Sequence, residues 1–348
     1  MDDSKGPVGN GITTQTTELK PKVNKPLSCD VLILEKCNLH CRKCYFWKHG
    51  IDSEVTIAEY KNFIISLKEL VEMPFELNLG GGEPLLKPEL LELISFSALQ
   101  GFHPVISTNA TLMTKEMAVR LCNSGLQRLS ISLESLDSNI HDFITGTAGA
   151  HKRLMAAIGY IKKYRQEGLF INIHTVITEN NLGGIPDLLE WVNRDSFFSG
   201  ISFIALAQPF RTEIIDRWYL HSDYGLLWPK DPEKAASIID MLIDCKNRGY
   251  KILNSLAQLT VYKKYYKNPD SFVRVHRCNF GDHVFNVNVL GCVQLCCFMP
   301  PIGNIKKSSI KDIWYSEEAS KTRALMRNCQ KSCNNIVNCY FKDGVDNG

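Results

Sequence analysis

The chain of 348 residues has little net charge and no long apolar run. Its 40 Lys and Arg residues nearly balance 37 Asp and Glu, giving a formal net charge of +3, which is too small to indicate a nucleic-acid-binding scaffold. Apolar segments such as residues 201–207 end well short of the roughly 18 residues that a membrane span requires. Residues 1–26 are polar and lack the apolar core of a signal peptide. The sequence therefore predicts a soluble cytoplasmic protein.

The cysteines do not fit a disulfide framework. The chain holds 13 of them, and an odd number without a secretory signal argues against disulfide pairing. Three fall within residues 37–44, and seven fall within residues 278–348. Cysteine clusters in a cytosolic protein are more often metal sites. Cys122 and Cys245 lie apart from both clusters within helix-like patterns, and we expect them to be small buried hydrophobic residues.

Short apolar runs alternate with amphipathic segments along more than half of the chain. Runs that suit buried strands occur at residues 31–34, 76–79, 104–108, 128–134, 169–177 and 200–207. Segments with helical spacing lie between them at residues 56–72, 88–100, 114–124, 150–167 and 184–194. This alternation predicts a parallel sheet with right-handed crossovers. Because six repeats are fewer than the eight of a closed barrel, the expected α/β fold is a partial (β/α)6 TIM-like barrel.

The cysteine-rich tail is expected to form a second, smaller unit. It carries short predicted strands at residues 284–289 and 293–295, and a polar module of this size usually needs a metal centre. The predicted organisation is a flexible lead-in over residues 1–27, a barrel over 28–230, a helical linker over 231–272 and the cysteine-rich domain over 273–348.

The first cysteine cluster has the spacing Cys37-x3-Cys41-x2-Cys44 and follows the first predicted strand. Three thiolates on one tight loop can bind three irons of a [4Fe–4S] cluster and leave the fourth iron open to a small molecule. The alternative is a zinc knuckle in which His40 or His49 supplies the fourth ligand. Sites in parallel α/β sheets lie at the carboxyl ends of the strands, so we expect polar motifs at the other strand ends to converge on this loop.

This loop resembles the cysteine motif of the radical S-adenosylmethionine (SAM) superfamily. Gly81-Gly82-Glu83-Pro84 is similar to the superfamily's second-strand motif, whose backbone and carboxylate receive the methionyl amino group; glycine permits close backbone approach and a carboxylate pairs with a cation. Segments after later strands are similar to its other SAM-contacting positions. The resemblance implies the following cofactor-binding residues: Gly81, Gly82, Glu83, Thr108, Asn109, Ser132, Glu134 and Asn181.

Two positions depart from the superfamily's pattern. Members usually carry an aromatic residue directly before the third cysteine, where this chain has Lys43. Relatives often carry an arginine in the segment at residues 143–147, where this chain has Thr145. Neither change removes a cluster ligand, but both affect the expected contacts of the adenosyl and carboxylate groups.

The tail resembles the SPASM/twitch extension of radical SAM enzymes. The resemblance rests on Cys278, Gly291 and Cys296, on the Gly-Asn-Ile and Ile-Trp segments that follow, and on the final cysteines. It implies an auxiliary [4Fe–4S] cluster held by Cys278, Cys296 and two residues from the set Cys329, Cys333 and Cys339. Because no cysteine follows Cys339, one auxiliary cluster is favoured over two, with Cys292 and Cys297 spare. A four-cysteine zinc ribbon is the alternative.

The resemblance implies an oxidoreductase-type enzyme. A reduced cluster would pass one electron to bound SAM and release methionine and a 5′-deoxyadenosyl radical, which removes a hydrogen atom from the substrate. An electron donor such as flavodoxin or ferredoxin would be needed. The expected outcome is oxidation, crosslinking or epimerisation of a peptide or small metabolite in a biosynthetic or maturation pathway.

Other functions remain open from the sequence. Epimerisation would need a thiol that returns a hydrogen atom, for which Cys292, Cys297 and Cys245 are candidates, although inert buried thiols are the ordinary interpretation. An RNA-modifying radical SAM enzyme is opposed by the near-neutral charge, and a non-enzymatic zinc-binding interaction module is the third possibility. Residues 208–229 follow the last barrel strand and either cover the barrel mouth, selecting the substrate, or link two domains.

Overall fold

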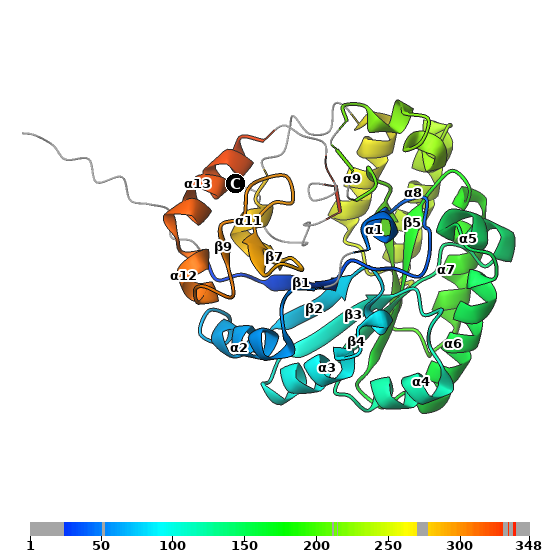
Figure 1. Cartoon of the computed structure of the whole chain (residues 1–348). Coiled ribbons are helices and arrows are strands. Elements are labelled where there is room, and N and C mark those ends of the chain that lie inside the picture. The colour runs from blue at the N-terminus through cyan, green and yellow to red at the C-terminus, as the bar shows by residue number, and fades with distance from the viewer. Residues whose placement is uncertain are drawn as a thin grey trace, which may run out of the picture.

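One continuous sheet organises the molecule. The computed structural model describes residues 24–50, 53–210, 212–213, 215–269, 278–329, 333 and 337–338. Within these residues nine strands run in the order β6-β5-β4-β3-β2-β1-β7-β8-β9 (Figure 1). The first six along the chain pair in parallel, namely β1 (Ser28–Leu34), β2 (Glu76–Gly81), β3 (His103–Thr108), β4 (Arg128–Ser132), β5 (Phe170–Ile177) and β6 (Gly200–Ala205). The prediction of an α/β partial barrel is confirmed.

Helices between the strands cover the outer face of this sheet (Figure 1). The predicted helices occur as α2 (Ile57–Leu67), α3 (Leu90–Leu99), α4 (Lys115–Cys122), α6 (Ala150–Tyr164) and α7 (Ile185–Arg194). Two helices lie outside the predicted alternation, α1 (Phe46–His49) and α5 (Ser138–Thr145). Helix α2 begins with a capping box in which the Glu59 N–H donates to Thr56 Oγ1 (3.3 Å) and the Thr56 N–H donates to Glu59 Oε2 (2.8 Å), which fixes its start.

The strands separate an apolar outer face from a polar inner face. Leu129 and Ile131 are fully buried in the main core. Successive side chains of a strand point to opposite faces, so Ser130 and Ser132 lie on the inner face. The sheet thereby buries apolar area on the side of the helices and presents hydroxyl groups to the interior of the barrel.

The tail joins the barrel sheet, which the sequence did not predict. Strand β7 (Val284–Val287) pairs in parallel with β1, with Ser28 opposite Val284, and β8 (Cys292–Gln294) and β9 (Gly303–Asn304) continue the sheet in antiparallel order. The open edge of β1 provides unpaired backbone groups that β7 satisfies. Helices α12 (Ile310–Trp314) and α13 (Glu317–Arg327) follow.

The predicted helical stretch at residues 232–267 consists of two helices, α8 (Pro232–Asn247) and α9 (Leu256–Lys267). Gly249, with a φ of 86°, adopts the left-handed conformation that commonly follows a helix end. The hydroxyls of three buried tyrosines on α9 donate to backbone carbonyls at the ends of β5 and β6, namely Tyr262, Tyr265 and Tyr266. The segment is therefore packed onto the barrel.

Several predictions lie outside the described residues. Residues 1–23 of the lead-in, residues 270–277 around the boundary of linker and tail, and Cys339 belong to this group. The domain boundaries stay predictions. Cys122 and Cys245 are buried, as expected. Among the described helices, none has the length and apolarity needed to cross a membrane.

Candidate active site

The loop that carries Cys37, Cys41 and Cys44 leaves the carboxyl end of β1. Burial raises the pKa of Cys37 to about 11, and burial also raises the pKa of Cys41, to which the charges of Cys44 and Cys37 add. The three sulfurs therefore share one electrostatic environment. Among the described residues, no three His, Cys, Asp or Glu side chains converge closely enough to hold a single metal ion. Each thiolate of a [4Fe–4S] cluster binds a different iron, so a cluster at these three thiols does not require that convergence.

The Gly-Gly-Glu segment is hydrogen-bonded to the backbone that enters the cysteine loop. The Gly82 N–H donates to the Leu34 carbonyl (3.0 Å), and the Glu83 N–H donates to the Lys36 carbonyl (2.9 Å). A Cβ on Gly81 would lie 2.0 Å from the Leu34 oxygen, and one on Gly82 would lie 2.0 Å from the Lys36 oxygen. Only glycine permits this approach, so both glycines hold the loop against β2.

The Glu83 carboxylate links the ends of β2 and β3. Its Oε1 accepts hydrogen bonds from Thr108 Oγ1 (2.6 Å) and the Leu85 N–H (3.1 Å), while Oε2 accepts one from the Asn109 N–H (2.8 Å). Burial raises the pKa of Glu83, and these hydrogen bonds oppose that rise. With one bond at Oε2, this oxygen keeps capacity for another donor.

Asn109 connects β3 directly to the cysteine loop. Its Nδ2 lies 3.9 Å from Cys37 Sγ and donates to Asn38 Oδ1 at 3.0 Å. Its Oδ1 accepts from the Thr111 N–H (2.9 Å), which fixes the orientation of the amide. Hydrogen bonds to the sulfur ligands tune an iron–sulfur cluster, so the amide is placed to do this at Cys37.

The last turn of α5 and Gly146, which follows it, also hold the loop. The Arg42 N–H donates to the Ile144 carbonyl (3.0 Å), and Arg42 Nε donates to the Phe143 carbonyl (2.9 Å). Gly146, at a φ of 63°, approaches His40 so closely that a Cβ would lie 2.2 Å from the His40 oxygen. This segment, noted in the sequence for its missing arginine, therefore supports the cysteine loop.

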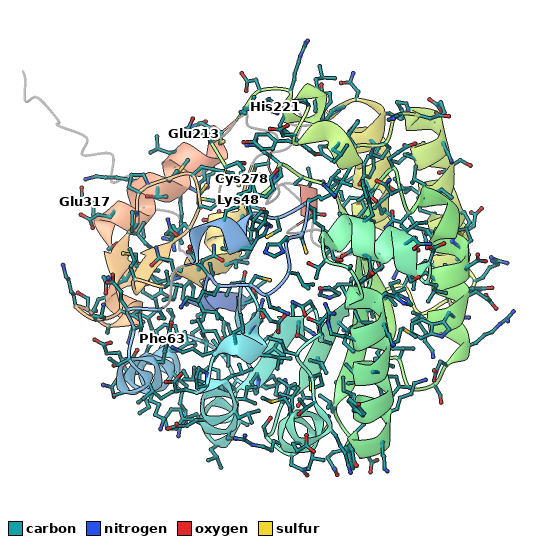
Figure 2. All side chains as sticks on the ribbon, turned by 45° about the vertical axis from the view of Figure 1, so that its right-hand side comes forward. Lys48, Phe63, Glu213, His221, Cys278 and Glu317 are labelled. Atoms are coloured by element: carbon teal, nitrogen blue, oxygen red, sulfur yellow. The ribbon has the colours of Figure 1, made fainter. Side chains whose placement is uncertain are left out.

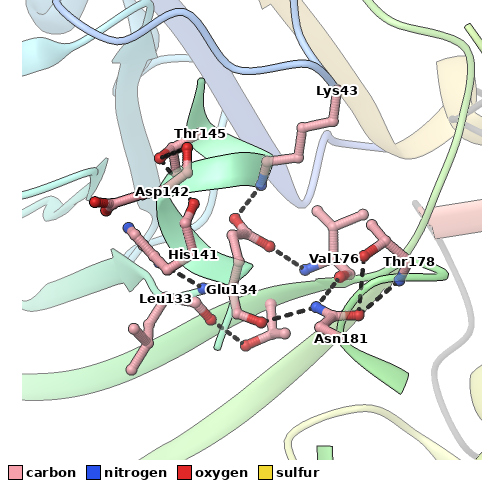
Figure 3. Close-up of polar contacts among 10 residues, drawn as sticks. Lys43, Leu133, Glu134, His141, Asp142, Thr145, Val176, Thr178 and Asn181 are labelled. Carbon is pink, nitrogen blue, oxygen red and sulfur yellow. Dashed lines mark hydrogen bonds and ion pairs between the residues drawn. The ribbon is translucent and has the colours of Figure 1, made fainter. Parts of the chain in front are cut away.

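Glu134 is the hub of a second polar network (Figure 3). One carboxylate oxygen pairs with the Lys43 ammonium, and the other accepts from the Val176 N–H (3.0 Å). The Glu134 carbonyl accepts from Asn181 Nδ2 (2.8 Å), and its N–H donates to Nδ1 of His141 (3.2 Å). The network brings the predicted Glu134 and Asn181 together with Lys43 of the cysteine loop.

Two members of this network were not predicted as site residues. Lys43 was visible in the sequence as a departure from the superfamily pattern, because it replaces an aromatic residue between two cysteines. His141 had no signal in the sequence, since it lies one helix turn inside α5. Burial lowers the pKa of His141 to about 4, so the imidazole is neutral and its Nδ1 accepts a hydrogen bond.

A row of polar side chains crosses the inner face of the barrel. Ser132 on β4 is opposite His174 on β5, which is opposite Ser202 on β6, and all three are partly exposed. None of them makes a side-chain hydrogen bond or ion pair within the described part of the chain. Burial lowers the pKa of His174 to about 4, and the charges of Arg128 and Lys43 lower it further. The row is therefore uncharged and offers both donors and acceptors.

The segment after β6 contacts the cysteine loop. Phe210 forms a parallel β-bridge with Cys44, and its ring stacks on Phe46 with centroids 6.0 Å apart. Tyr224 meets Tyr45 edge-on at 5.9 Å. Figure 2 shows His221 of the same segment near the top of the view, above Lys48 of α1. These contacts favour a covering role for the segment over that of a linker.

Five cysteines of the tail fall into one electrostatic group. Burial raises the pKa of Cys278, and the charges of Cys296 and Cys329 add to it. The pKa of Cys297 is raised most by a hydrogen bond to Cys296. Burial and the charges of Cys296 and Cys333 raise it further. The structure thus brings four of the five predicted auxiliary ligands together and adds Cys297, while Cys339 lies outside the described residues.

The other two candidate hydrogen-atom donors have partners elsewhere. Cys292 Sγ accepts from Asn304 Nδ2 at 3.5 Å. Cys245 is buried in α8, where its sulfur accepts from Arg248 at 3.0 Å. Of the three candidates, only Cys297 interacts with the other tail cysteines of the preceding paragraph, among the residues that the structure describes.

Two protein-family models match separate parts of the chain. Residues 31–192 match the model of the radical SAM superfamily, and residues 278–340 match the model of the SPASM iron–sulfur cluster-binding domain. These matches support iron–sulfur clusters over the zinc alternatives, while the individual cysteine ligands stay predictions.

The known proteins with similar sequences include enzymes that are named for different substrates. The chain is 27% identical over 294 residues to the AdoMet-dependent heme synthase of Nitratidesulfovibrio vulgaris, covering 82% of this chain and 78% of that protein. It is 24% identical to the PqqA peptide cyclase of Rhodopseudomonas palustris, covering 91% and 80%. The crystal structure of Streptococcus suis SuiB bound to S-adenosylmethionine shares the fold with a TM-score of 0.68 at 16% identity, over 92% of this chain and 77% of SuiB. The chain thus belongs to the radical SAM superfamily and carries a C-terminal SPASM iron–sulfur domain.

Proposed function

We propose that this radical SAM enzyme removes a hydrogen atom from a peptide or a cofactor precursor and releases an oxidised product. The observation that carries the proposal is the fixation of the Cys37–Cys44 loop against Gly82, Glu83 and Asn109 at the carboxyl edge of the barrel. When bound and reduced, the cluster supplies the electron that splits SAM into methionine and a 5′-deoxyadenosyl radical.

Different residues around the loop would bind the cluster and SAM. Cys37, Cys41 and Cys44 would bind three irons, and the Asn109 amide donates toward the Cys37 sulfur. The second acceptor position of Glu83 Oε2, together with the backbone at Gly81, would receive the methionyl amino group. Gly82, Thr108, Ser132, Glu134 and Asn181 complete the proposed SAM site.

The inner-face row would contact the substrate through His174 and Ser202, while Ser132 at the end of the row belongs to the proposed SAM site. Two uncharged side chains with donors and acceptors suit amide or hydroxyl groups better than a bare hydrocarbon. Substrate classes are suggested by the relatives, since one is named a heme synthase and another a PqqA peptide cyclase. SuiB, which shares the fold, has a structure bound to its precursor peptide SuiA. A polar peptide or cofactor precursor fits both the row and these names.

An oxidised product is favoured over an epimer. A single auxiliary cluster, bound by Cys278, Cys296 and two of Cys329, Cys333 and Cys339, would provide an electron acceptor. Epimerisation needs a free thiol at the substrate. Cys245 is buried in α8, Cys292 lies on β8 beside the outer edge strand β9, and Cys297 is hydrogen-bonded to Cys296 within the proposed auxiliary site.

The proposal is tested with anaerobically reconstituted protein. Iron content is measured, dithionite is added as reductant, and methionine and 5′-deoxyadenosine are quantified with and without peptide and porphyrin candidates. The expected result is cleavage of SAM by the wild type, stimulation by one substrate class, and a product that has lost hydrogen. A variant with Cys37, Cys41 and Cys44 replaced by Ala serves as the control. Cleavage that persists in this variant, or that is absent from the iron-loaded wild type, would contradict the proposal.

A further inference from the structure

Lys43 is a largely buried cation inside the cysteine loop. It stands between Cys41 and Cys44 in the sequence, its side chain is only 17% exposed, and its ammonium pairs with the 1% exposed carboxylate of Glu134. A buried lysine is rare unless it is paired. The pair therefore joins the cysteine loop to the carboxyl end of β4.

Glu134 is held in place by groups other than Lys43. Its second oxygen accepts from the Val176 N–H of β5, and its main chain bonds to Asn181 and His141 (Figure 3). The carboxylate therefore cannot move away with the lysine, and the ammonium has one fixed position relative to the strands and the loop.

Lys43 belongs to the cysteine loop itself and directly precedes Cys44, whereas Glu134 lies after β4 and reaches the loop through the Lys43 ammonium. The cation is therefore the member of the pair that is built into the loop. In agreement with this placement, Lys43 lowers the pKa of Cys41 and Cys44, and Glu134 raises that of Cys41.

We propose that Lys43 and Glu134 form a charge pair that sets the reduction potential of the cluster held by Cys37, Cys41 and Cys44, with Lys43 the dominant member. This inference rests on the proposed function, because it requires the cluster. Reduction adds one negative charge, so a nearby cation favours the reduced state and a nearby anion opposes it. Lys43 is thus a positioning residue that also eases reduction by an electron donor.

The sign of the effect separates electrostatics from structure. Lys43→Met and Glu134→Gln break the same ion pair, so a purely structural role predicts shifts in the same direction, or none. The charge-pair role predicts a more negative potential for Lys43→Met and a less negative one for Glu134→Gln. Removing one partner of a buried pair can prevent folding. The double variant removes both charges and is expected to fold, with a potential between those of the single variants.

The test is an anaerobic redox titration of the reconstituted holoenzyme without SAM, followed by electron paramagnetic resonance of the reduced cluster. The signal of the first cluster is identified in parallel samples by its response to SAM. Lys43→Arg keeps the charge and should stay near the wild-type potential. Lys48→Met is the matched control, because Lys48 is exposed and lies over the Tyr45 ring at 3.6 Å. It should leave the potential unchanged.

The outcomes distinguish this inference from the proposed function. Opposite shifts in the two single variants support the charge pair. Shifts in one direction, no shift, or a double variant outside the range of the singles would overturn it, even where the wild type cleaves SAM. A wild type that holds no cluster or does not cleave SAM would instead overturn the proposed function.

Discussion

The two cysteine regions of this chain are built in different ways. The first places Cys37, Cys41 and Cys44 on one short loop, which residues without sulfur hold from the end of β2, the end of β3 and the turn between α5 and α6. The second gathers cysteines from the start of α11 (Phe280–His283), the end of β8 and the residues after α13. In the first, local sequence sets the spacing of the sulfurs, and in the second the tertiary fold sets it.

The difference teaches where each region is vulnerable. The first depends on close backbone approach at Gly82 and Gly146, where no side chain fits. The second depends on the pairing of β7 with β1 and on Arg323, which is 2% exposed and donates to the carbonyls of Gly281 and Trp314. Substitutions outside the cysteines should therefore damage one region and spare the other.

The largest expected effect separates the two clusters by function. Cys41→Ala should reduce SAM cleavage to the level of a blank without enzyme, because the first cluster loses a ligand. Cys296→Ala should retain SAM cleavage but lose the oxidised product. Both are measured by chromatography of 5′-deoxyadenosine and product after anaerobic turnover. If Cys296→Ala abolished cleavage as completely as Cys41→Ala, the regions would not be separable.

Gly82→Ala tests the close approach that holds the first region. The added Cβ would lie 2.0 Å from the Lys36 carbonyl oxygen, and such overpacking costs about 3 kcal/mol of unfolding free energy. Gly159→Ala is the control, because nothing lies within 4 Å of its Cβ position in α6 and Ala in a helix stabilises by about 0.5–1 kcal/mol. Urea unfolding should give opposite signs, and equal stabilities would contradict the argument.

Arg323→Met tests the second region. Burial lowers the pKa of Arg323 to about 10, and the substitution removes the hydrogen bonds that Arg323 donates to the Gly281 and Trp314 carbonyls, which costs about 1–3 kcal/mol. The expected result is less iron per chain with SAM cleavage kept. Arg327→Met, at a more exposed partner of Asp282, should lose little iron. Loss of SAM cleavage in Arg323→Met would show that the regions are coupled.

Acid should weaken the first region through His141. Its pKa is lowered to about 4 in the folded chain, below the ordinary 6.5 or so of the unfolded chain. The unfolded state then binds more protons, so stability falls as the pH falls through this window. Between pH 7 and pH 5, wild type should lose about 2 kcal/mol more than His141→Gln, measured by urea unfolding at each pH. If the unfolding free energies of wild type and His141→Gln changed equally with pH, His141 would not be the source of the acid sensitivity.

The sequence predicted the elements whose signal is local. Six barrel strands and the helices between them follow from apolar periodicity, and the Cys37–Cys44 loop was placed at a strand end by the run that precedes it. Thr56 and Glu59 mark the start of α2 because a capping box uses residues three apart. The family that these motifs predict is confirmed by the matches of residues 31–192 and 278–340 to the two family models.

Features that depend on pairing between distant segments were not predicted. The addition of β7 to β1 requires a partner about 250 residues away, and a four-residue strand carries no signal for its partner. The row Ser132, His174 and Ser202 exists only in the register of β4 to β6. The sequence pattern leaves Cys297 spare, because the electrostatic influence of Cys333 on it depends on how the tail folds.

The central claim is that the first three thiols hold a cluster whose fourth iron binds SAM. The most direct test uses a Cys278→Ala, Cys296→Ala double variant, which should retain the first cluster alone. Its reduced electron paramagnetic resonance spectrum is recorded before and after addition of SAM. A single cluster signal that changes on addition of SAM is the predicted result. A spectrum with no cluster signal, or one that SAM leaves unchanged, would contradict the account.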